Sequence, residues 1–393
     1  MAMTHDVLGF TVGTAAAGVR DGTPSRTDVA LIASDRICAA AGVFTTNQVI
    51  AAPCVVTRRH LEQGRLRAIV VNSGNANACT GEQGERHAVM MARAAAQRIG
   101  CDPYEVAVAS TGVIGVPLPV ERIMKAVKGI GLRPGEWSDV AKAIMTTDTK
   151  PKLLGVELPL RAGTVHVRGV AKGAGMIHPN MATMLAFVMT DADVEVSALR
   201  HFVRHASERT FNAISVDGDT STNDTLLVLA NGASGVKPEG DELAQFANVL
   251  EGVCETLARE IVADGEGVTK VFEVSIRGAE TAEDARRAAR TVTTSSLVKT
   301  AIHGSDPNWG RILAAAGRSG AKVDQTHASV RIGEVVVFAA GAPRPLDRDA
   351  VRRVFDRKEI PIEVDLGVGA ETARAWGTDL SEEYVRINAD YTT

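Results

Sequence analysis

The sequence predicts a mixed α+β protein in which helices and strands pack in layers. Runs of β-branched residues alternate with alanine-rich runs of helical periodicity, and glycine is abundant at 37 residues while aromatic residues make up only 4%. The strands and helices do not follow a strict βαβ order, which favours a layered sandwich over a doubly wound parallel sheet. A chain of 393 residues also exceeds the size at which one hydrophobic core usually stops growing. We therefore expect two substructures.

The N-terminal half supplies most of the predicted sheet. Leu66–Val71 and Val106–Ser110 have the apolar, β-branched composition of buried strands, and Arg86–Ile99 between them is a helix rich in alanine and methionine. Val165–Val170 alternates as a strand does, and Met184–Thr190 is a further apolar strand.

The C-terminal half is predicted to contain three strands and four helices. The strands are expected at Thr225–Ala230, Lys270–Arg277 and Ser329–Phe338. The helices are expected at Ser197–Thr210, Asp241–Val262, Glu280–Ala289 and Asp347–Phe355. The charged helix near residue 280 marks the expected start of a smaller C-terminal region.

Composition and motifs exclude several classes of protein. The formal charge of −4 comes from 43 basic and 47 acidic residues that are well mixed, so neither nucleic acid nor an anionic membrane is an expected partner. The five cysteines are widely spaced and form no CxxC pair. The chain also has no apolar run of about 18 residues and no signal-like N-terminus, so we expect a cytoplasmic protein. No P-loop, dinucleotide fingerprint, zinc motif or GxSxG elbow occurs. The string Asp217–Asp224 resembles a calcium loop but has Thr222 where glycine is required, so we interpret it as a turn and expect no metal.

Six strings rich in glycine and threonine have no evident structural purpose. Small residues let the backbone approach a ligand closely, and consecutive amides in such turns can bind an anion. One such string is most simply a tight turn, but six in one chain indicate a site. They are Asn72–Gly81, Ser110–Gly115, Met145–Thr149, Ala171–Leu185, Asp264–Gly267 and Lys299–Arg311.

The string around Thr183 suggests a specific chemistry. A threonine hydroxyl is a poor nucleophile unless a base lies beside it, and an α-amine on the same residue provides that base when threonine is the first residue of a chain. Such an amine titrates near pH 8 and has a fixed distance to the hydroxyl. Thr183 reaches this state if its hydroxyl attacks the carbonyl of Ala182 and the resulting ester is hydrolysed. By itself the hexapeptide is a weak signal, because any Ala-Thr before a buried strand looks the same.

In their order along the chain, the strings resemble the ornithine acetyltransferase family, the bifunctional glutamate N-acetyltransferases of arginine biosynthesis. The shared strings are STGVIG, MTTDT, AKGAGM, PNMATML, DGEG, DPNWGR and a Thr-Thr terminus, and the resemblance runs nearly from end to end. It implies an α/β/β/α sandwich of the ornithine acetyltransferase and aminopeptidase kind with a smaller C-terminal α/β region. It also implies cleavage between Ala182 and Thr183 into fragments 1–182 and 183–393. The resemblance further implies a heterotetramer that contains two copies of each fragment.

The resemblance also assigns roles to residues. Thr183 would take the acetyl group of N-acetylornithine and pass it to glutamate in a ping-pong cycle, with Thr111 and Gly112 as the oxyanion hole. Substrate contacts carry over to Thr147, Lys172, Thr183, Glu266, Asn388 and Thr393. No cofactor is expected, and acetyl-CoA is a second acetyl donor in bifunctional members. From charge alone, Lys172 suits a substrate carboxylate and Glu266 suits the ornithine ammonium, although surface charges in loops would be equally compatible with the sequence.

Three alternatives remain open at the level of the sequence. The first is an autoproteolytic aminopeptidase or amidohydrolase of related fold, in which water accepts the acyl group. The second is a non-enzymatic binding or scaffold protein that keeps the fold. The third is a family member that serves a secondary pathway.

Overall fold

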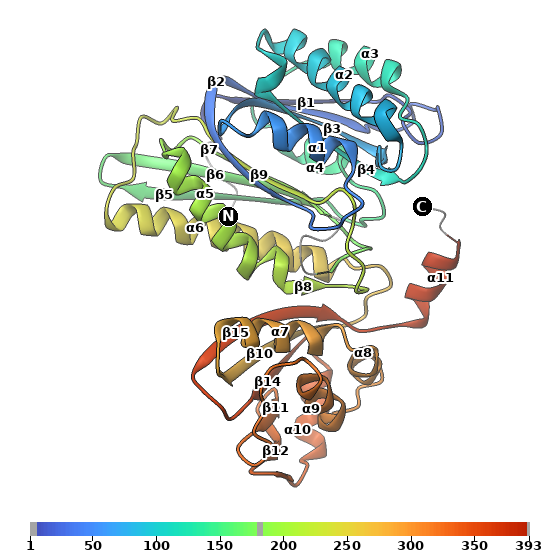
Figure 1. Ribbon diagram of the computed structural model, residues 1–393, viewed down its shortest axis with the longest axis vertical. Helices are drawn as coiled ribbons and strands as arrows, with labels where there is room; N and C mark the ends of the chain where they lie inside the picture. The colour runs from blue at the N-terminus through green and yellow to red at the C-terminus, as the bar shows by residue number, and fades with distance from the viewer. Residues whose placement is uncertain (1–5, 179–183, 391–393) are drawn as a thin grey trace.

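The computed structural model describes residues 6–178 and 184–390. Within these ranges the chain forms eleven α-helices and two β-sheets, which belong to a larger and a smaller lobe (Figure 1). This arrangement confirms the predicted mixed α+β class.

The larger lobe is built on an eight-stranded sheet with the order β4-β3-β2-β9-β7-β6-β5, in which β1 pairs with β2. Its strands are β1 (Phe10–Ala15), β2 (Val29–Phe44), β3 (Arg65–Asn75), β4 (Val106–Val113), β5 (Lys152–Leu160), β6 (Gly163–Lys172), β7 (Leu185–Thr190) and β9 (Thr225–Ala230). Its helices are α1 (Ala52–His60), α2 (Gly81–Ile99), α3 (Val120–Gly129), α4 (Trp137–Ala143), α5 (Val196–Arg209) and α6 (Asp241–Ala263).

The long strand β2 makes the sheet fold over on itself. Its first half pairs with β3 and its second half, from Ala39 on, pairs with β9, with a register shift between Ala33 and Cys38. Leu31 packs toward α2, Ile32 lies in the apolar layer between the two halves of the sheet, and Ala41 packs with the core under α5 and α6. One strand therefore belongs to both leaves of a sandwich.

Helices cover the two outer faces of this sandwich. Helices α1, α2 and α3 lie on the leaf formed by β1 to β4, and α5 and α6 lie on the leaf formed by β5, β6, β7 and β9 (Figure 1). Buried side chains such as Ile69, Phe187 and Leu227 fill the space between the leaves. The layer order is α/β/β/α, as predicted. None of the described helices is long and apolar enough to span a membrane.

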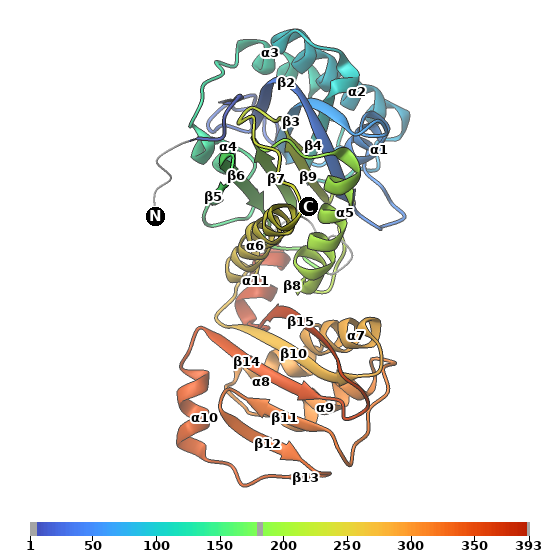
Figure 2. The same cartoon turned by 90° about the vertical axis from the view of Figure 1, so that its left-hand side faces the viewer.

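The smaller lobe contains a seven-stranded sheet with the order β13-β12-β11-β14-β10-β15-β8 (Figure 2). Its strands are β8 (Ile214–Ser215), β10 (Val271–Ala279), β11 (Ser329–Ile332), β12 (Val335–Ala339), β13 (Ala342–Pro343), β14 (Glu359–Asp365) and β15 (Glu371–Thr378). Its helices are α7 (Ala282–Thr293), α8 (Ser296–His303), α9 (Trp309–Gly317), α10 (Arg348–Phe355) and α11 (Glu382–Asp390). Helices α7, α8 and α9 pack against one face of this sheet (Figure 2).

The two lobes are joined at β8. This short strand precedes β9 in the chain, yet it pairs with β15 through Trp376↔Ile214 and Gly377↔Ser215. The buried Lys299 ammonium reinforces the junction, because it donates to the carbonyl oxygens of Val216 at 2.7 Å and Thr378 at 2.6 Å. This pairing could not be predicted from the sequence, because a two-residue strand has no detectable periodicity.

The predicted elements of the smaller lobe need one correction. The segment expected as one strand, Ser329–Phe338, is a hairpin in which β11 and β12 are joined at Gly333 and Glu334. Gly333 has φ of 57°, a left-handed conformation that glycine adopts without strain and that reverses the chain. Apart from β8, the strands of the second sheet begin at Val271, and the charged helix near residue 280 packs on this sheet as α7.

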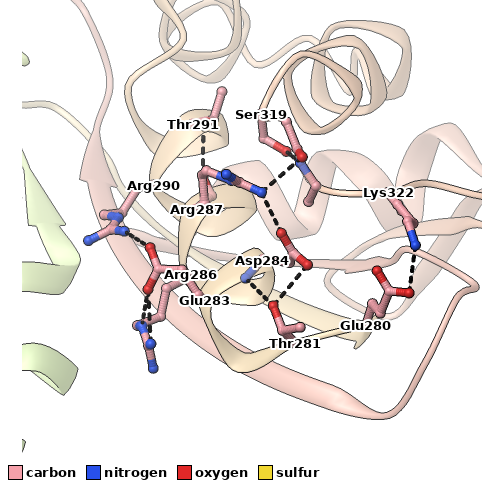
Figure 3. Close-up of polar contacts among 12 residues, drawn as sticks. Glu280, Thr281, Glu283, Asp284, Arg286, Arg287, Arg290, Thr291, Ser319 and Lys322 are labelled. Carbon is pink, nitrogen blue, oxygen red and sulfur yellow. Dashed lines mark hydrogen bonds and ion pairs between the residues drawn. The ribbon is translucent and has the colours of Figure 1, made fainter.

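Helix α7 shows why its sequence is both charged and alanine-rich. Its N-cap Thr281 accepts from the amide of Asp284, and Ala285 and Ala288 face the core. On the outer side, Arg286 and Arg290 both bond Glu283 (Figure 3). These exposed pairs are typical of a solvent-facing helix surface.

Candidate active site

A polar pocket of about 80 Å³ lies where the two lobes meet. The ends of β4 and β6, the loop before β9, the loop after α6 and helix α11 all contribute to it. In Figure 1, α11 rises from the smaller lobe toward the larger one. The lining residues are Ala76, Thr111, Gly112, Ile114, Thr146, Thr147, Lys172, Gly175, Met176, Ser221, Thr222, Asn223, Glu266 and Asn388.

Six residues that were singled out from the sequence line this one pocket, although they are separated by up to 277 positions in the chain. They are Thr111, Gly112, Thr147, Lys172, Glu266 and Asn388. The remaining predicted site residues, Ala182, Thr183 and Thr393, lie outside the described residues. The structure thus brings five of the six strings to one pocket, and the role of each residue stays a prediction. No residue of the sixth string, Lys299–Arg311, lines this pocket.

Gly112 brings the end of β4 very close to the neighbouring strand. Its φ is 134°, and a Cβ at this position would lie 2.3 Å from the carbonyl carbon of Gly74 and 2.4 Å from the amide nitrogen of Asn75. Only glycine fits such an approach between two backbones. The sequence string STGVIG therefore contains a glycine that the local packing of β3 and β4 requires.

Lys172 is the most deeply buried charged side chain that lines the pocket, with 2% exposure. It ends β6, and its Nζ donates to Thr111 Oγ1 at 3.2 Å. Burial lowers the pKa of Lys172, against the attraction of Asp148. The alternative interpretation of Lys172 as a surface charge is wrong.

Glu266 reaches the pocket from the loop after α6. Its amide donates to the carbonyl of Ala174 at 3.0 Å, and its carboxylate accepts from Asn388 Nδ2 at 2.9 Å. A Cβ on Gly175 would lie within 2.6 Å of all three atoms of this carboxyl group, the nearest at 2.4 Å, so the glycine makes room for it. Through this contact α11, near the end of the chain, completes the wall of the pocket.

Behind the pocket lies a buried ion cluster. Lys152 Nζ bonds Asp148 Oδ1 at 2.7 Å and Asp264 Oδ2 at 2.6 Å, and all three side chains are at most 3% exposed. Asp148 also accepts from the amide of Gly173 at 2.7 Å. Burial alone would raise the pKa of Asp148, but Lys172, Lys152 and the Gly173 amide together lower it. The cluster therefore links the three segments that carry Thr147, Lys172 and Glu266.

The start of β7 is held by a second buried carboxyl group. Asp224 Oδ1 accepts from the amide of Met184 at 3.1 Å, and Asp224 is fully buried. Burial raises its pKa well above the usual range. Lys172 on β6, Leu185 on β7 and Thr225 on β9 lie in one row across the sheet.

The segment on the other side of the undescribed residues is held by Asp217. Its carboxylate accepts from the amides of Met176 at 2.6 Å and Ile177 at 2.9 Å. Burial raises the pKa of Asp217 to about 6. The described residues that flank positions 179–183 are therefore both anchored by carboxyl groups of the 217–224 string.

Sequence reasoning missed the part of this string that faces the pocket. Ser221, Thr222 and Asn223 line it, and Asn223 Nδ2 donates to the carbonyls of Ala76 at 2.6 Å and Ser110 at 2.9 Å. The string was interpreted as a turn, and its backbone contacts fit a turn, as in the bond from the Asn223 amide to Ser221 Oγ. Its dense polar composition was the available signal. No group of three or more His, Cys, Asp or Glu side chains placed to bind a metal occurs among the described residues.

A pocket with a buried ammonium, a carboxylate and several hydroxyl and amide donors, at the strand ends of an α/β/β/α sandwich, defines an enzyme that acts on a small polar molecule. Comparison with known proteins specifies the class further. The ArgJ family model matches residues 11–393.

Relatives of similar length carry the same family name. A protein named "Arginine biosynthesis bifunctional protein ArgJ" from Symbiobacterium thermophilum is 51% identical over 390 residues, which are 98% of this chain and 97% of the relative. One of the same name from Thermus thermophilus is 49% identical over 388 residues, with 98% of each chain covered. A crystal structure of ArgJ from Bacillus halodurans has a TM-score of 0.51 and 41% identity, and the match covers 52% of this chain and 98% of that one. The chain belongs to the ArgJ family.

Proposed function

We propose that this protein transfers the acetyl group of N-acetylornithine to glutamate, with an acetyl ester on Thr183 as the intermediate. The products are ornithine and N-acetylglutamate, in arginine biosynthesis. Membership of the ArgJ family supports the reaction class, and the observation that carries the proposal is the convergence of the motif residues on one pocket beside the start of β7. Thr183 is joined directly to Met184, the residue that Asp224 anchors there.

The nucleophile is generated by the chain itself. The Thr183 hydroxyl attacks the carbonyl carbon of Ala182, the Ala182–Thr183 peptide bond breaks, and water hydrolyses the ester that results. This yields fragments 1–182 and 183–393, and it leaves a free α-amine on Thr183 to act as the base. A solved ArgJ chain that matches over 98% of its own length but only 52% of this chain is what such a division would produce.

In the transfer step, the α-amine takes the hydroxyl proton as the Thr183 oxygen attacks the acetyl carbonyl. The oxyanion that forms is stabilised by the Thr111 hydroxyl and the Gly112 amide, and the proton passes to the ornithine nitrogen as the amide bond breaks. The amine of glutamate then attacks the acetyl ester and regenerates Thr183. Removal of one oxyanion donor typically costs about 10²–10³ in rate.

The charged groups of the pocket suit substrates of this kind. Glu266, held by Asn388, is an anion for the side-chain ammonium of ornithine, and Lys172 and Thr147 are donors for polar groups of the substrate. Thr393 is proposed as a further contact from the end of the chain. We propose no metal and no cofactor, with acetyl-CoA as an additional acetyl donor that uses the same Thr183.

The assembly and location follow the same proposal. Two copies of each fragment would form a heterotetramer, and the enzyme would act in the cytoplasm on its small-molecule substrates.

Acetyl transfer is tested by incubating the purified protein with N-acetylornithine, with and without glutamate. The proposal predicts that N-acetylglutamate forms and that ornithine release accelerates with glutamate. Release of acetate at a rate unaffected by glutamate would instead identify a hydrolase with water as acceptor. Absence of both products, with an uncleaved chain, would identify a binding protein. Formation of N-acetylglutamate from added acetyl-CoA and glutamate would distinguish a bifunctional enzyme from a monofunctional one.

A further inference from the structure

The contact between Lys172 and Thr111 constrains where the hydroxyl proton of Thr111 lies. Lys172 Nζ is 3.2 Å from Thr111 Oγ1, and both residues are 2% exposed. An ammonium group has three donors and no acceptor, so Thr111 Oγ1 is the acceptor in this bond. The single hydroxyl proton of Thr111 must therefore point away from Lys172.

The pocket is the direction that remains for this proton. Thr111 lines the pocket, and within residues 6–178 and 184–390 no acceptor for its hydroxyl is recorded. A hydroxyl that has accepted a charge-assisted hydrogen bond is polarised and becomes a better donor. The geometry is that of a donor oriented before the substrate arrives, which is what stabilisation of a developing oxyanion requires.

We propose that Lys172 is a positioning residue of the oxyanion hole, which keeps the Thr111 hydroxyl proton directed into the pocket. This inference rests on the proposed function, in which Thr111 is an oxyanion donor, and it gives Lys172 a task other than binding a substrate carboxylate. Lys172 acts through Thr111, so its effect disappears when the Thr111 hydroxyl is removed.

The orientation depends on the charge of Lys172. A neutral amine can accept a hydrogen bond, so loss of the proton lets the Thr111 hydroxyl turn toward Nζ and away from the pocket. The ionisable groups that act on Lys172 are Asp148, Asp224 and Glu266, which favour its charged form, and Lys152, which disfavours it. Burial lowers the pKa of Lys172, so the reversal occurs below the pH at which an exposed lysine titrates.

An acetyl donor without a carboxylate distinguishes the two roles of Lys172, which are to orient the Thr111 hydroxyl and to bind a substrate carboxylate. p-Nitrophenyl acetate can acetylate Thr183 and requires the oxyanion hole, but it presents no carboxylate to Lys172. The acylation rate is measured by nitrophenolate release per mole of cleaved enzyme in wild type, Thr111→Ala, Lys172→Met and the double variant. Lys150→Met, which replaces an exposed lysine near the pocket, is the matched control.

We expect Thr111→Ala to lower this rate about 100-fold or more and Lys172→Met to lower it at least tenfold. The double variant should be no slower than Thr111→Ala alone, because the two residues act as a unit. Lys150→Met should match wild type. An unchanged rate in Lys172→Met, or multiplicative losses in the double variant, would overturn the inference and leave Lys172 as a carboxylate ligand.

Lys172→Arg and Lys172→Gln cover the case in which Lys172→Met does not fold or cleave. Arginine is a donor-only cation that stays protonated, so Lys172→Arg should be faster than Lys172→Gln, and its alkaline loss of rate should move to higher pH. Equal rates and equal pH profiles would contradict the inference. A wild-type enzyme in which neither p-nitrophenyl acetate nor N-acetylornithine acetylates Thr183 would instead overturn the proposed function, and this inference with it.

Discussion

The amide of Met184 donates to Asp224 Oδ1 at 3.1 Å, and Asp224 has no exposed surface. Its other oxygen, Oδ2, has no hydrogen-bond partner among the described residues. Met184 immediately follows the proposed nucleophile, so Asp224 is a fixed acceptor one residue from the bond that is proposed to break.

Substitution of Asp224 tests whether this carboxyl group is protonated. Burial raises the pKa of Asp224 well above its usual range, because burial disfavours the charged carboxylate. Asn keeps the size and the acceptor for Met184, so Asp224→Asn should change the free energy of unfolding by less than about 1 kcal/mol. Asp224→Ala should cost about 1–3 kcal/mol, because the buried Met184 amide loses its partner. Urea unfolding of uncleaved protein in a Thr183→Ala background measures the free energy of unfolding of both variants. Equal losses in the two variants would show that the carboxyl group is charged.

The buried ion cluster should contribute more to stability than any surface pair. Asp148→Asn removes the negative partner of Lys152 and leaves a buried ammonium with one carboxylate fewer, which should cost about 3–5 kcal/mol. The matched control is Lys322→Met, which breaks the exposed pair with Glu280 (Figure 3) and should cost less than about 1 kcal/mol. Thermal unfolding compares them. Similar losses of stability in the two variants would show that the buried cluster stabilises the fold no more than an exposed ion pair does.

Glu266 should determine affinity for the ornithine side chain. Glu266→Gln keeps an acceptor for Asn388 but loses the charge, and a charge-assisted bond is worth about 1.5–3 kcal/mol. We therefore expect kcat/KM for N-acetylornithine to fall about 10- to 150-fold. The acylation rate with p-nitrophenyl acetate, which has no ammonium group, serves as the internal reference. A parallel fall with both donors would mean that Glu266 supports the fold of the pocket and does not recognise the ammonium.

Asp217 predicts a pH-dependent stability. Burial raises its pKa to about 6 from an ordinary value of 3.8, so the folded state binds a proton that the unfolded state has already released between these values. Stability from this group is fully present below pH 3.8 and is lost as the pH rises through 6. Relative to Asp217→Asn, wild type should lose roughly 2–3 kcal/mol between pH 4 and pH 7, because each unit of difference between the two pKa values corresponds to about 1.4 kcal/mol. Unfolding curves of both proteins across this pH range check the direction of the change in stability. A difference in the free energy of unfolding that stays constant with pH would contradict this prediction.

Much of the fold was predictable because its strands are buried on both faces. Val106–Ser110 and Thr225–Ala230 are apolar runs between turns, and both appear as predicted, within β4 and as β9. The strand β2 was not predicted, because three exposed residues interrupt its apolar pattern and its second half, with three consecutive alanines, has little β preference. Its role as the shared strand of both leaves depends on partners far away in the chain, which local patterns do not contain.

The site was predictable from its motif strings but not from their surroundings. The family resemblance assigned roles to Thr111 and Lys172. It assigned none to Asp148, which lies inside the Met145–Thr149 string, or to Asp224, which ends the string interpreted as a turn. Their importance comes from burial beside a lysine and beside the amide of Met184, and burial is a property of the folded chain. The family resemblance named Asn388, but its contact with Glu266 exists only because α11 returns to the pocket.

The most direct test is to trap the acetyl group on the enzyme. Purified protein is mixed with N-acetylornithine in the absence of glutamate, quenched in acid and analysed by mass spectrometry, with Thr183→Ala as the control. The account predicts two fragments that divide between Ala182 and Thr183, one acetyl group in the peptide that begins at Thr183, and an intact, unlabelled chain in the control. An active wild-type chain that remains whole, or an acetyl group on any other residue, would contradict it.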